Sequence, residues 1–292
     1  MKNLISELVK KGPIITDGAW GTMLHALGLK SGECADGWNI FNPEKVKQVA
    51  RAYADAGSRI LLTNTFRANR LTLKAFNLDS KIKEINANGV KISKKAIKDR
   101  GYVFASIGPV GSSLVTNKIS DDELRELFYE QAIILADAGA DAIVIESVFN
   151  LNEGYLAMEA AKRTGLPIVL SMTFDKENFI SSKNNFHTVR EYKEKLSGAD
   201  MIGINCGTGV EDSLLHIKRL STYTKAPLWV KPSAGIPSVV REKIVYPTTI
   251  KNFVEYSRVL KSLGVKFIGG CCGTTPEYIA RMAMTLRNNS DS

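Results

Sequence analysis

Short apolar runs alternate with longer amphipathic stretches along almost the whole chain. The short runs are rich in β-branched residues and predict strands, whereas the longer stretches repeat their apolar positions with the period of a helix. The predicted strands are Ile14–Asp17, Arg59–Asn64, Tyr102–Ile107, Ala142–Glu146, Ile168–Thr173, Met201–Cys206, Leu228–Lys231 and Phe267–Gly270. The predicted helices are Pro43–Ala56, Ser80–Asp99, Ser120–Ala138, Leu151–Arg163, Thr188–Leu196, Val210–Ser221, Thr248–Leu263 and Pro276–Leu286. This regular alternation predicts parallel strands joined by crossover helices.

Local signals support these boundaries. Ser120 and Glu123 have the spacing of a capping box at a helix N-terminus. Gly57, Gly139 and Gly264 follow predicted helices, where glycine adopts the left-handed conformation at little cost. We see no Pro-, Gly- or Ser-rich linker that separates two domains, so residues 1–292 are expected to form a single (β/α)8 TIM barrel rather than two ordinary domains or an open doubly wound sheet.

Composition narrows the class of protein. Of the 292 residues, 44% are hydrophobic, which is enough for a large core, yet no apolar run reaches the roughly 18 residues of a membrane helix. Residues Met1 to Lys11 lack the apolar segment of a secretory signal, so we expect a cytoplasmic protein that binds no membrane. The net charge of +9 fits a soluble lysine-rich surface or, alternatively, an anionic partner. Basic residues are dispersed and no nucleic-acid-binding signature is present, which argues against that function.

Polar and reactive residues end the predicted strands, and in such barrels the active site lies at the C-terminal ends of the strands. They are Asp17, Asn64, Ser106, Glu146, Thr173, Asn205 and Lys231. Asp17 and Glu146 can pair with an ammonium group and so select an amino-acid thiol; the alternative is that either one pairs with a nearby Arg or Lys. Gly18, directly after Asp17, permits close approach of the backbone to a ligand.

The strongest chemical signal is Gly269-Gly270-Cys271-Cys272-Gly273. Neighbouring residues on a regular strand point to opposite faces, so both sulfurs reach one metal ion only where the flanking glycines let the backbone leave that geometry. Cys206 ends the sixth predicted strand and is the third candidate ligand. Buried inert cysteines are the alternative, and Cys34, which stands alone, is interpreted as structural. His25, His187 and His216 have no metal-ligand spacing with one another.

Three cysteine ligands predict a particular kind of zinc chemistry. Catalytic zinc sites have three protein ligands and keep a fourth position for a water or a substrate. Three thiolates and Zn²⁺ together carry a charge of −1, so the ion is a poor Lewis acid for making hydroxide. It is instead suited to ionising a substrate thiol while leaving the sulfur nucleophilic.

These residues give the chain a resemblance to the zinc-dependent homocysteine S-methyltransferases, most of all to the homocysteine-binding module at the N-terminus of cobalamin-dependent methionine synthase. The matching stretches are Asp17–Thr22, Ala56–Phe66, Ile107–Pro109, Gly203–Cys206, Lys231–Gly235 and Gly269–Pro276. The resemblance implies that Cys206, Cys271 and Cys272 bind zinc and that the homocysteine thiolate takes the open position. It also implies that Asp17 and Glu146 bind the substrate amino group, and that backbone near Ser106 and Gly18 helps to hold its carboxylate. Asn64 and Asn205 are further candidate substrate contacts.

The resemblance also implies the reaction: methyl transfer to homocysteine, giving methionine. The donor it favours, through Lys231–Pro237, is methylcobalamin carried by a separate corrinoid protein; S-methylmethionine and betaine are the alternatives. Two departures bear on the substrate, because Ile180–Asn185 lacks the Thr-Gly-Thr-like stretch of that branch, and Lys231 stands where an acidic or amide residue is more usual. A related enzyme acting on another thiol, and a non-catalytic docking barrel with a structural zinc, therefore remain as alternatives.

Overall fold

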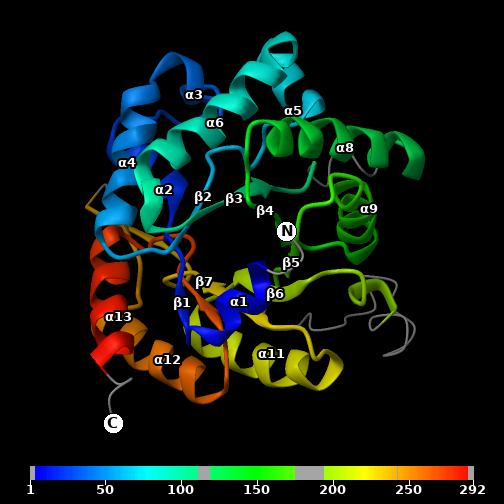
Figure 1. Cartoon of the computed structure of the whole chain (residues 1–292). Coiled ribbons are helices and arrows are strands. Elements are labelled where there is room, and N and C mark those ends of the chain that lie inside the picture. Colours follow the sequence, from blue (N-terminus) through cyan, green and yellow to red (C-terminus); the bar gives the residue numbers. More distant parts are fainter. Residues whose placement is uncertain (1–3, 111–118, 175–193, 242, 289–292) are drawn as a thin grey trace.

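Eight parallel strands form one sheet in the computed structural model, which describes residues 4–110, 119–174, 194–241 and 243–288. The strands lie in the order β1-β10-β7-β6-β5-β4-β3-β2, and a parallel bridge between Thr16 and Ile60 joins the two outer strands. The sheet thus closes into the predicted single (β/α)8 barrel (Figure 1). The strands are β1 Ile14–Ile15, β2 Ile60–Leu62, β3 Tyr102–Ile107, β4 Ala142–Val148, β5 Ile168–Met172, β6 Met201–Cys206, β7 Leu228–Pro232 and β10 Phe267–Ile268.

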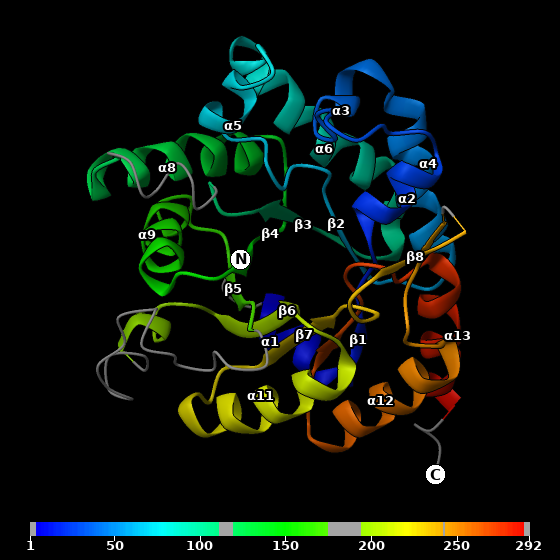
Figure 2. The same cartoon turned by 180° about the vertical axis from the view of Figure 1, so that it is seen from behind.

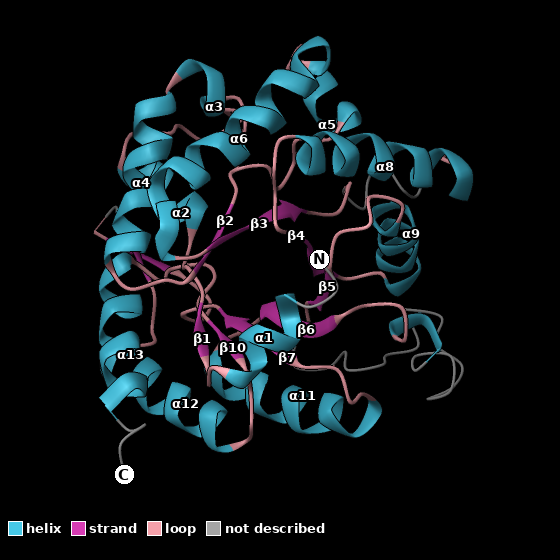
Figure 3. Cartoon of the chain, viewed as in Figure 1, coloured by secondary structure: helices cyan, strands magenta, loops and turns pink. Residues whose placement is uncertain are grey.

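Helices surround the strands, as the colouring by secondary structure shows (Figure 3). Seven of the predicted helices are present in the described residues, with ends within two residues of those expected. They are α4 Pro43–Asp55, α6 Ile82–Ile97, α8 Asp121–Asp137, α9 Leu151–Lys162, α11 Val210–Tyr223, α12 Ile250–Ser262 and α13 Pro276–Asn288. The predicted helix Thr188–Leu196 lies almost wholly outside the described residues, as does the Ile180–Asn185 stretch. No helix of the described chain is long and apolar enough to cross a bilayer.

Several short elements were not predicted. They are α1 Leu4–Lys10, α2 Trp20–Ala26, α3 Trp38–Phe41, α5 Arg70–Lys74 and an antiparallel hairpin of β8 Ser238–Val240 with β9 Lys243–Val245. The hairpin lies at the edge of the molecule in the view from behind (Figure 2) and exposes 75% of Val239 and 67% of Ile244. It follows β7, so it belongs to the loops at the C-terminal ends of the strands.

The barrel interior is filled by side chains, to which all eight strands contribute. Within it Trp229 stacks on Phe104 with ring centroids 5.8 Å apart, and Phe267 packs against Trp229 with centroids 6.0 Å apart. Ile5 and Leu8 of α1 join the same interior cluster. Because apolar side chains fill the interior, we expect the active site at the C-terminal ends of the strands and in the loops that follow them.

Candidate active site

The three predicted metal ligands come together at the C-terminal end of the barrel. The Sγ atoms of Cys206, Cys271 and Cys272 all lie within 4.8 Å of one another, and they form the one such His, Cys, Asp or Glu group found among the described residues. Cys206 is the last residue of β6, and the other two follow β10. Cys272 is exposed, whereas Cys206 and Cys271 are partly buried, so solvent reaches the cluster through Cys272.

The backbone around the cysteines departs from strand geometry. Cys206 itself has a φ of 61°, a left-handed conformation that non-glycine residues seldom adopt. The Cys271 amide donates to Pro232 O at 2.9 Å, and the Ala234 amide donates to Cys272 O at 2.8 Å. These bonds tie the double-cysteine turn to the end of β7, so that three strand ends together fix the positions of the sulfurs.

The spacing of the sulfurs fits a metal ion. Cys206 Sγ and Cys272 Sγ are 3.7 Å apart. Two sulfurs each about 2.3 Å from one tetrahedral zinc lie about 3.8 Å from each other, whereas a disulfide holds them at about 2.0 Å. The cluster therefore has the separation of ligands to a shared ion.

Electrostatics within the cluster point the same way. Hydrogen bonds from the thiols of Cys206 and Cys271 lower the pKa of Cys272 to about 3. Sharing hydrogen bonds with the same two neighbours, and burial, raise the pKa of Cys206 well above its ordinary value. The three sulfurs thus hold one negative charge readily and resist further ionisation, and a bound cation is what lets neighbouring thiols ionise together.

Asp17, a predicted substrate contact, is held entirely by protein groups in this structure. Its Oδ2 accepts from the Trp20 indole at 2.7 Å and from the Leu62 amide at 2.7 Å, and its Oδ1 pairs with the Lys231 ammonium. The two charged side chains are 0% and 2% exposed. Of the two interpretations of Asp17 that the sequence left open, pairing with a lysine is the one present here.

Glu146 is the more accessible of the two predicted carboxylates, with 8% of the residue exposed. It accepts a hydrogen bond from the hydroxyl of Ser106, the next-to-last residue of the neighbouring strand β3. Burial raises the pKa of Glu146 to about 7, against the opposing pull of the Lys231 ammonium. A carboxyl group with such a pKa changes charge near neutrality, which is a common property of functional groups.

The two predicted asparagines have structural partners. Asn205 accepts from the Ser171 hydroxyl at 2.7 Å and donates to Ser147 Oγ at 2.7 Å, and its amide also lies 3.9 Å from Cys271 Sγ. Asn64 donates to Ala35 O at 2.7 Å, which fastens the loop after β1. Asn205 thus lies beside Cys271, whereas Asn64 contacts the loop that follows β1.

Two aromatic residues of the site were not identified as functional from the sequence. The Tyr53 hydroxyl lies 2.9 Å from Thr274 O and 3.0 Å from Ala19 O, joining the turns after β10 and β1. The Trp20 indole donates to Asp17 and so orients it. The only feature of the sequence that could have pointed to Trp20 is its position within the Asp17–Thr22 stretch. Gly18 is required here by packing, because a Cβ on it would lie 2.7 Å from Thr274 O.

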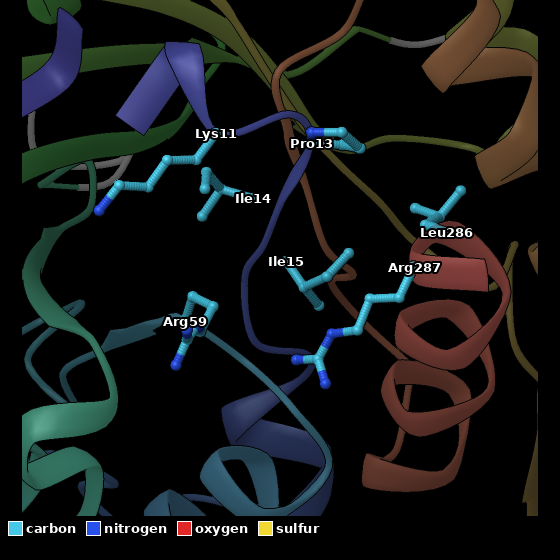
Figure 4. Close-up of a pocket in the computed structure, with 7 residues that line it drawn as sticks. All are labelled: Lys11, Pro13, Ile14, Ile15, Arg59, Leu286 and Arg287. Atoms are coloured by element: carbon cyan, nitrogen blue, oxygen red, sulfur yellow. The ribbon is translucent and has the colours of Figure 1, made fainter. Parts of the chain in front are cut away.

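A separate cavity of about 310 Å³ lies at the opposite end of the barrel, near the starts of β1 and β2. Its lining includes the cationic side chains of Lys11, Arg59 and Arg287 beside Ile14 and Ile15 (Figure 4). Active sites of these barrels form at the other end, so this cavity is not where the cysteine chemistry takes place.

Comparison with known proteins gives a consistent family. The family model described as homocysteine S-methyltransferase matches residues 14–286. The methionine synthase of Mycobacterium tuberculosis (strain ATCC 25618 / H37Rv) is 28% identical over an alignment of 302 positions, which covers 97% of this chain and 25% of that protein. The methionine synthase of Mycobacterium leprae (strain TN) is 27% identical over 305 residues, with 98% and 25% covered. The chain therefore spans about a quarter of the length of these relatives.

Among solved structures, the homocysteine methyltransferase MmuM from Escherichia coli has the same fold. Its metallated form superposes with a TM-score of 0.81 at 24% identity, covering 96% of this chain and 99% of that one. Its oxidized form gives a TM-score of 0.80 at 23% identity, covering 99% and 100%.

Proposed function

The chain belongs to the homocysteine S-methyltransferase family, and we propose that it methylates the thiol of homocysteine, giving methionine, at the cluster of Cys206, Cys271 and Cys272. The observation that carries this proposal is the convergence of three sulfurs at the catalytic end of a barrel whose residues 14–286 match the family. The methionine synthases, with which the chain shares 27–28% identity, support the same substrate.

Zinc is the metal we propose for the cluster. The all-sulfur donor set and the 3.7 Å separation of Cys206 and Cys272 support it. When bound there, zinc supplies a position at which a substrate thiol ionises at neutral pH and keeps its nucleophilicity. The chain itself holds the ligands in place, through the left-handed turn at Cys206 and the amide of Asn205 beside Cys271.

The rest of the substrate is proposed to lie against the strand ends that face the cluster. Glu146, oriented by the Ser106 hydroxyl, binds the amino group of homocysteine in its ionised form. Asp17 lies at the same end of the site, where its carboxylate forms an ion pair with Lys231. Backbone near Gly18 and Ser106, with Asn64 and Asn205, completes the proposed binding site.

The reaction itself is a displacement at carbon. A sulfur–carbon bond forms between the homocysteine thiolate and the methyl group, while the bond between that methyl and the donor breaks and its electron pair leaves with the donor. We propose a methylcorrinoid such as methylcobalamin, delivered by a corrinoid protein, as the donor. The likeness of Lys231–Pro237 to the cobalamin-linked branch supports this choice over S-methylmethionine or betaine.

An assay with a panel of donors tests the function. The zinc-loaded chain is incubated with homocysteine and either methylcobalamin, a methylated corrinoid protein, S-methylmethionine or betaine, and methionine is quantified. Methionine from the corrinoid donors supports the proposal, and methionine from one of the others corrects the donor. If none of the four yields methionine, the proposed function is wrong.

The metal is tested with a matched pair of cysteine variants. Cys206→Ser removes one thiolate from the cluster and should lower bound zinc, measured by mass spectrometry of the dialysed protein, from about one per chain to well below that. Cys34→Ser is the control, because burial raises the pKa of Cys34 to about 11 and it lies outside the cluster. Equal zinc contents in the two variants would contradict the assignment of the ligands.

A further inference from the structure

Lys231 combines the burial of a core residue with a positive charge inside the candidate site. Trp229, two residues earlier on β7, belongs to the barrel interior, so Lys231 points to the same side of the strand. Its Nζ lies 5.8 Å from the centroid of the Trp229 indole, and the side chain is 2% exposed. A lysine this deeply buried is unusual unless a partner compensates its charge.

Asp17 supplies that compensation, and protein donors occupy most of the acceptor positions of its carboxylate. The carboxylate offers about four acceptor positions. In this structure it takes up donors from Trp20, Leu62 and Lys231, and none of its surface is exposed. A substrate ammonium therefore cannot reach Asp17 unless Lys231 first gives up its ion pair.

The Lys231 ammonium, by contrast, has donors to spare. It carries three N–H groups, and its one hydrogen bond within the described residues goes to Asp17. The described residues offer no hydrogen-bond acceptor to the other two buried, charged N–H donors, which is costly, and the ligand that best satisfies such donors is an anion. The two oxygens of a carboxylate match this requirement.

We propose that Lys231 is the residue that determines head-group specificity, binding the carboxylate of the acceptor thiol while Asp17 holds its ammonium in position. The proposal rests on the function proposed above and names the class of substrate for that site. The class is thiols with an anionic head group, in which an α-amino group contributes through Glu146 alone. Asp17 is then a positioning residue and does not itself bind the substrate.

The charge at this end of the site supports the same class. Asp17 and Lys231 cancel, which leaves Glu146, whose burial raises its pKa to about 7, as the source of net negative charge. The head-group end is thus close to neutral rather than strongly negative. Such a site gives little advantage to an isolated ammonium group and does not repel a carboxylate.

Two thiols that each carry half of the homocysteine head group test the proposal. The first is 4-mercaptobutanoate, which has the carboxylate and no amine, and the second is 3-aminopropane-1-thiol, which has the amine and no carboxylate. Dissociation constants for the zinc-loaded full chain are measured by titration calorimetry. The wild type should bind the mercapto acid about tenfold or more tightly than the aminothiol, the difference that one charged hydrogen bond typically makes.

Variants of the ion pair then assign that preference to Lys231. Lys231→Met removes the carboxylate partner and frees Asp17, so the order of the two thiols should reverse. Asp17→Asn/Lys231→Met removes both charges without leaving a buried carboxylate unpaired, and it should bind both thiols within about threefold of each other. Lys94→Met is the matched control, because Lys94 pairs with Asp141 at 2.7 Å outside the site, and it should keep the wild-type order.

The outcomes separate this inference from the proposed function. If the wild type prefers the aminothiol, or if both Lys231 variants keep the wild-type order, the inference is wrong even where homocysteine is methylated. If the thiols bind in the expected order and no donor yields methionine, the inference stands and the proposed function fails. If neither thiol binds to the zinc-loaded chain, the inference is wrong, and the donor assay alone decides the proposed function.

Discussion

At the scale of single residues, the burial of Glu146 makes its charge depend on pH near neutrality. Because its pKa is raised to about 7 and only the ionised carboxylate attracts an ammonium group, the KM for homocysteine should fall as pH rises through about 7. Glu146→Gln should raise this KM about tenfold at pH 8 and abolish the change with pH. Steady-state kinetics from pH 6 to 8.5 check both effects, and an unchanged pH profile in the variant would contradict the assignment.

Asp36 shows how a buried carboxyl group affects stability instead. Burial raises its pKa from 3.8 to about 6, so between these values the folded chain keeps a proton that the unfolded chain releases. The protonated group therefore contributes its full stabilisation below pH 3.8, and this contribution is lost as pH rises through about 6. The free energy of unfolding falls by about 3 kcal/mol in total over this range. Asp36→Asn keeps an acceptor for the Arg67 amide and should gain about 1 kcal/mol over the wild type between pH 5 and pH 7 in urea denaturation.

The sequence predicted some residues of the site and could not predict others, for a physical reason. The cysteines were identified because two adjacent thiols between glycines have few purely structural explanations. The partner of Asp17 was left open because Lys231 is 214 positions away, and only barrel closure decides which strand ends meet. Tyr53 was missed because a tyrosine on the apolar face of α4 is indistinguishable in pattern from an ordinary core residue.

At the scale of elements, α8 begins as its sequence predicted. The Ser120 side chain accepts from the Glu123 amide, and the Glu123 side chain accepts from the Ser120 amide at 2.9 Å. Ser120→Ala removes the first of these bonds and should lower the free energy of unfolding by about 1 kcal/mol. Ser262→Ala, at the end of α12, removes a hydroxyl whose hydrogen bond goes to Val259 O of the same helix. This control should lower the free energy of unfolding by less than half as much as Ser120→Ala. Urea denaturation compares the two variants, and equal losses would argue against the cap.

Elements with a clear hydrophobic periodicity were predictable from the sequence. Elements whose conformation depends on tertiary contacts were not. The seven long helices carry their own hydrophobic pattern over many residues, and the barrel strands are short apolar runs that recur between them at regular intervals. The short helices α2 and α3, in the loop after β1, have only 7 and 4 residues, too few to show a helical period. The β8–β9 hairpin exposes Val239 and Ile244, so its apolar residues do not mark a buried face. Tertiary contacts, such as the Tyr53 hydroxyl on Ala19 O beside α2, are what place such segments.

At the scale of the whole molecule, the barrel depends on a helix that precedes the residues matched by the family model. The match to the family begins at residue 14, yet α1 inserts Ile5 and Leu8 into the interior cluster to which every barrel strand contributes. The structure thus has two ends with different tasks: the cysteines and charged groups occupy one, while α1 packs into the apolar interior. Loss of the packing of α1 into the interior should therefore lower the stability of the fold without altering the metal ligands.

Leu8→Ala tests this division. Leu8 is 3% exposed and is surrounded by the large apolar side chains of the interior cluster. Its truncation to alanine should lower the free energy of unfolding by about 3 kcal/mol. Leu215→Ala makes the same chemical change at a residue that is 51% exposed and should cost less than about 1 kcal/mol. Because α1 lies away from the strand ends that hold the cysteines, zinc content in the folded Leu8→Ala protein should match the wild type. Denaturation with parallel metal analysis checks this, and loss of zinc together with stability would mean that the two ends of the barrel are coupled.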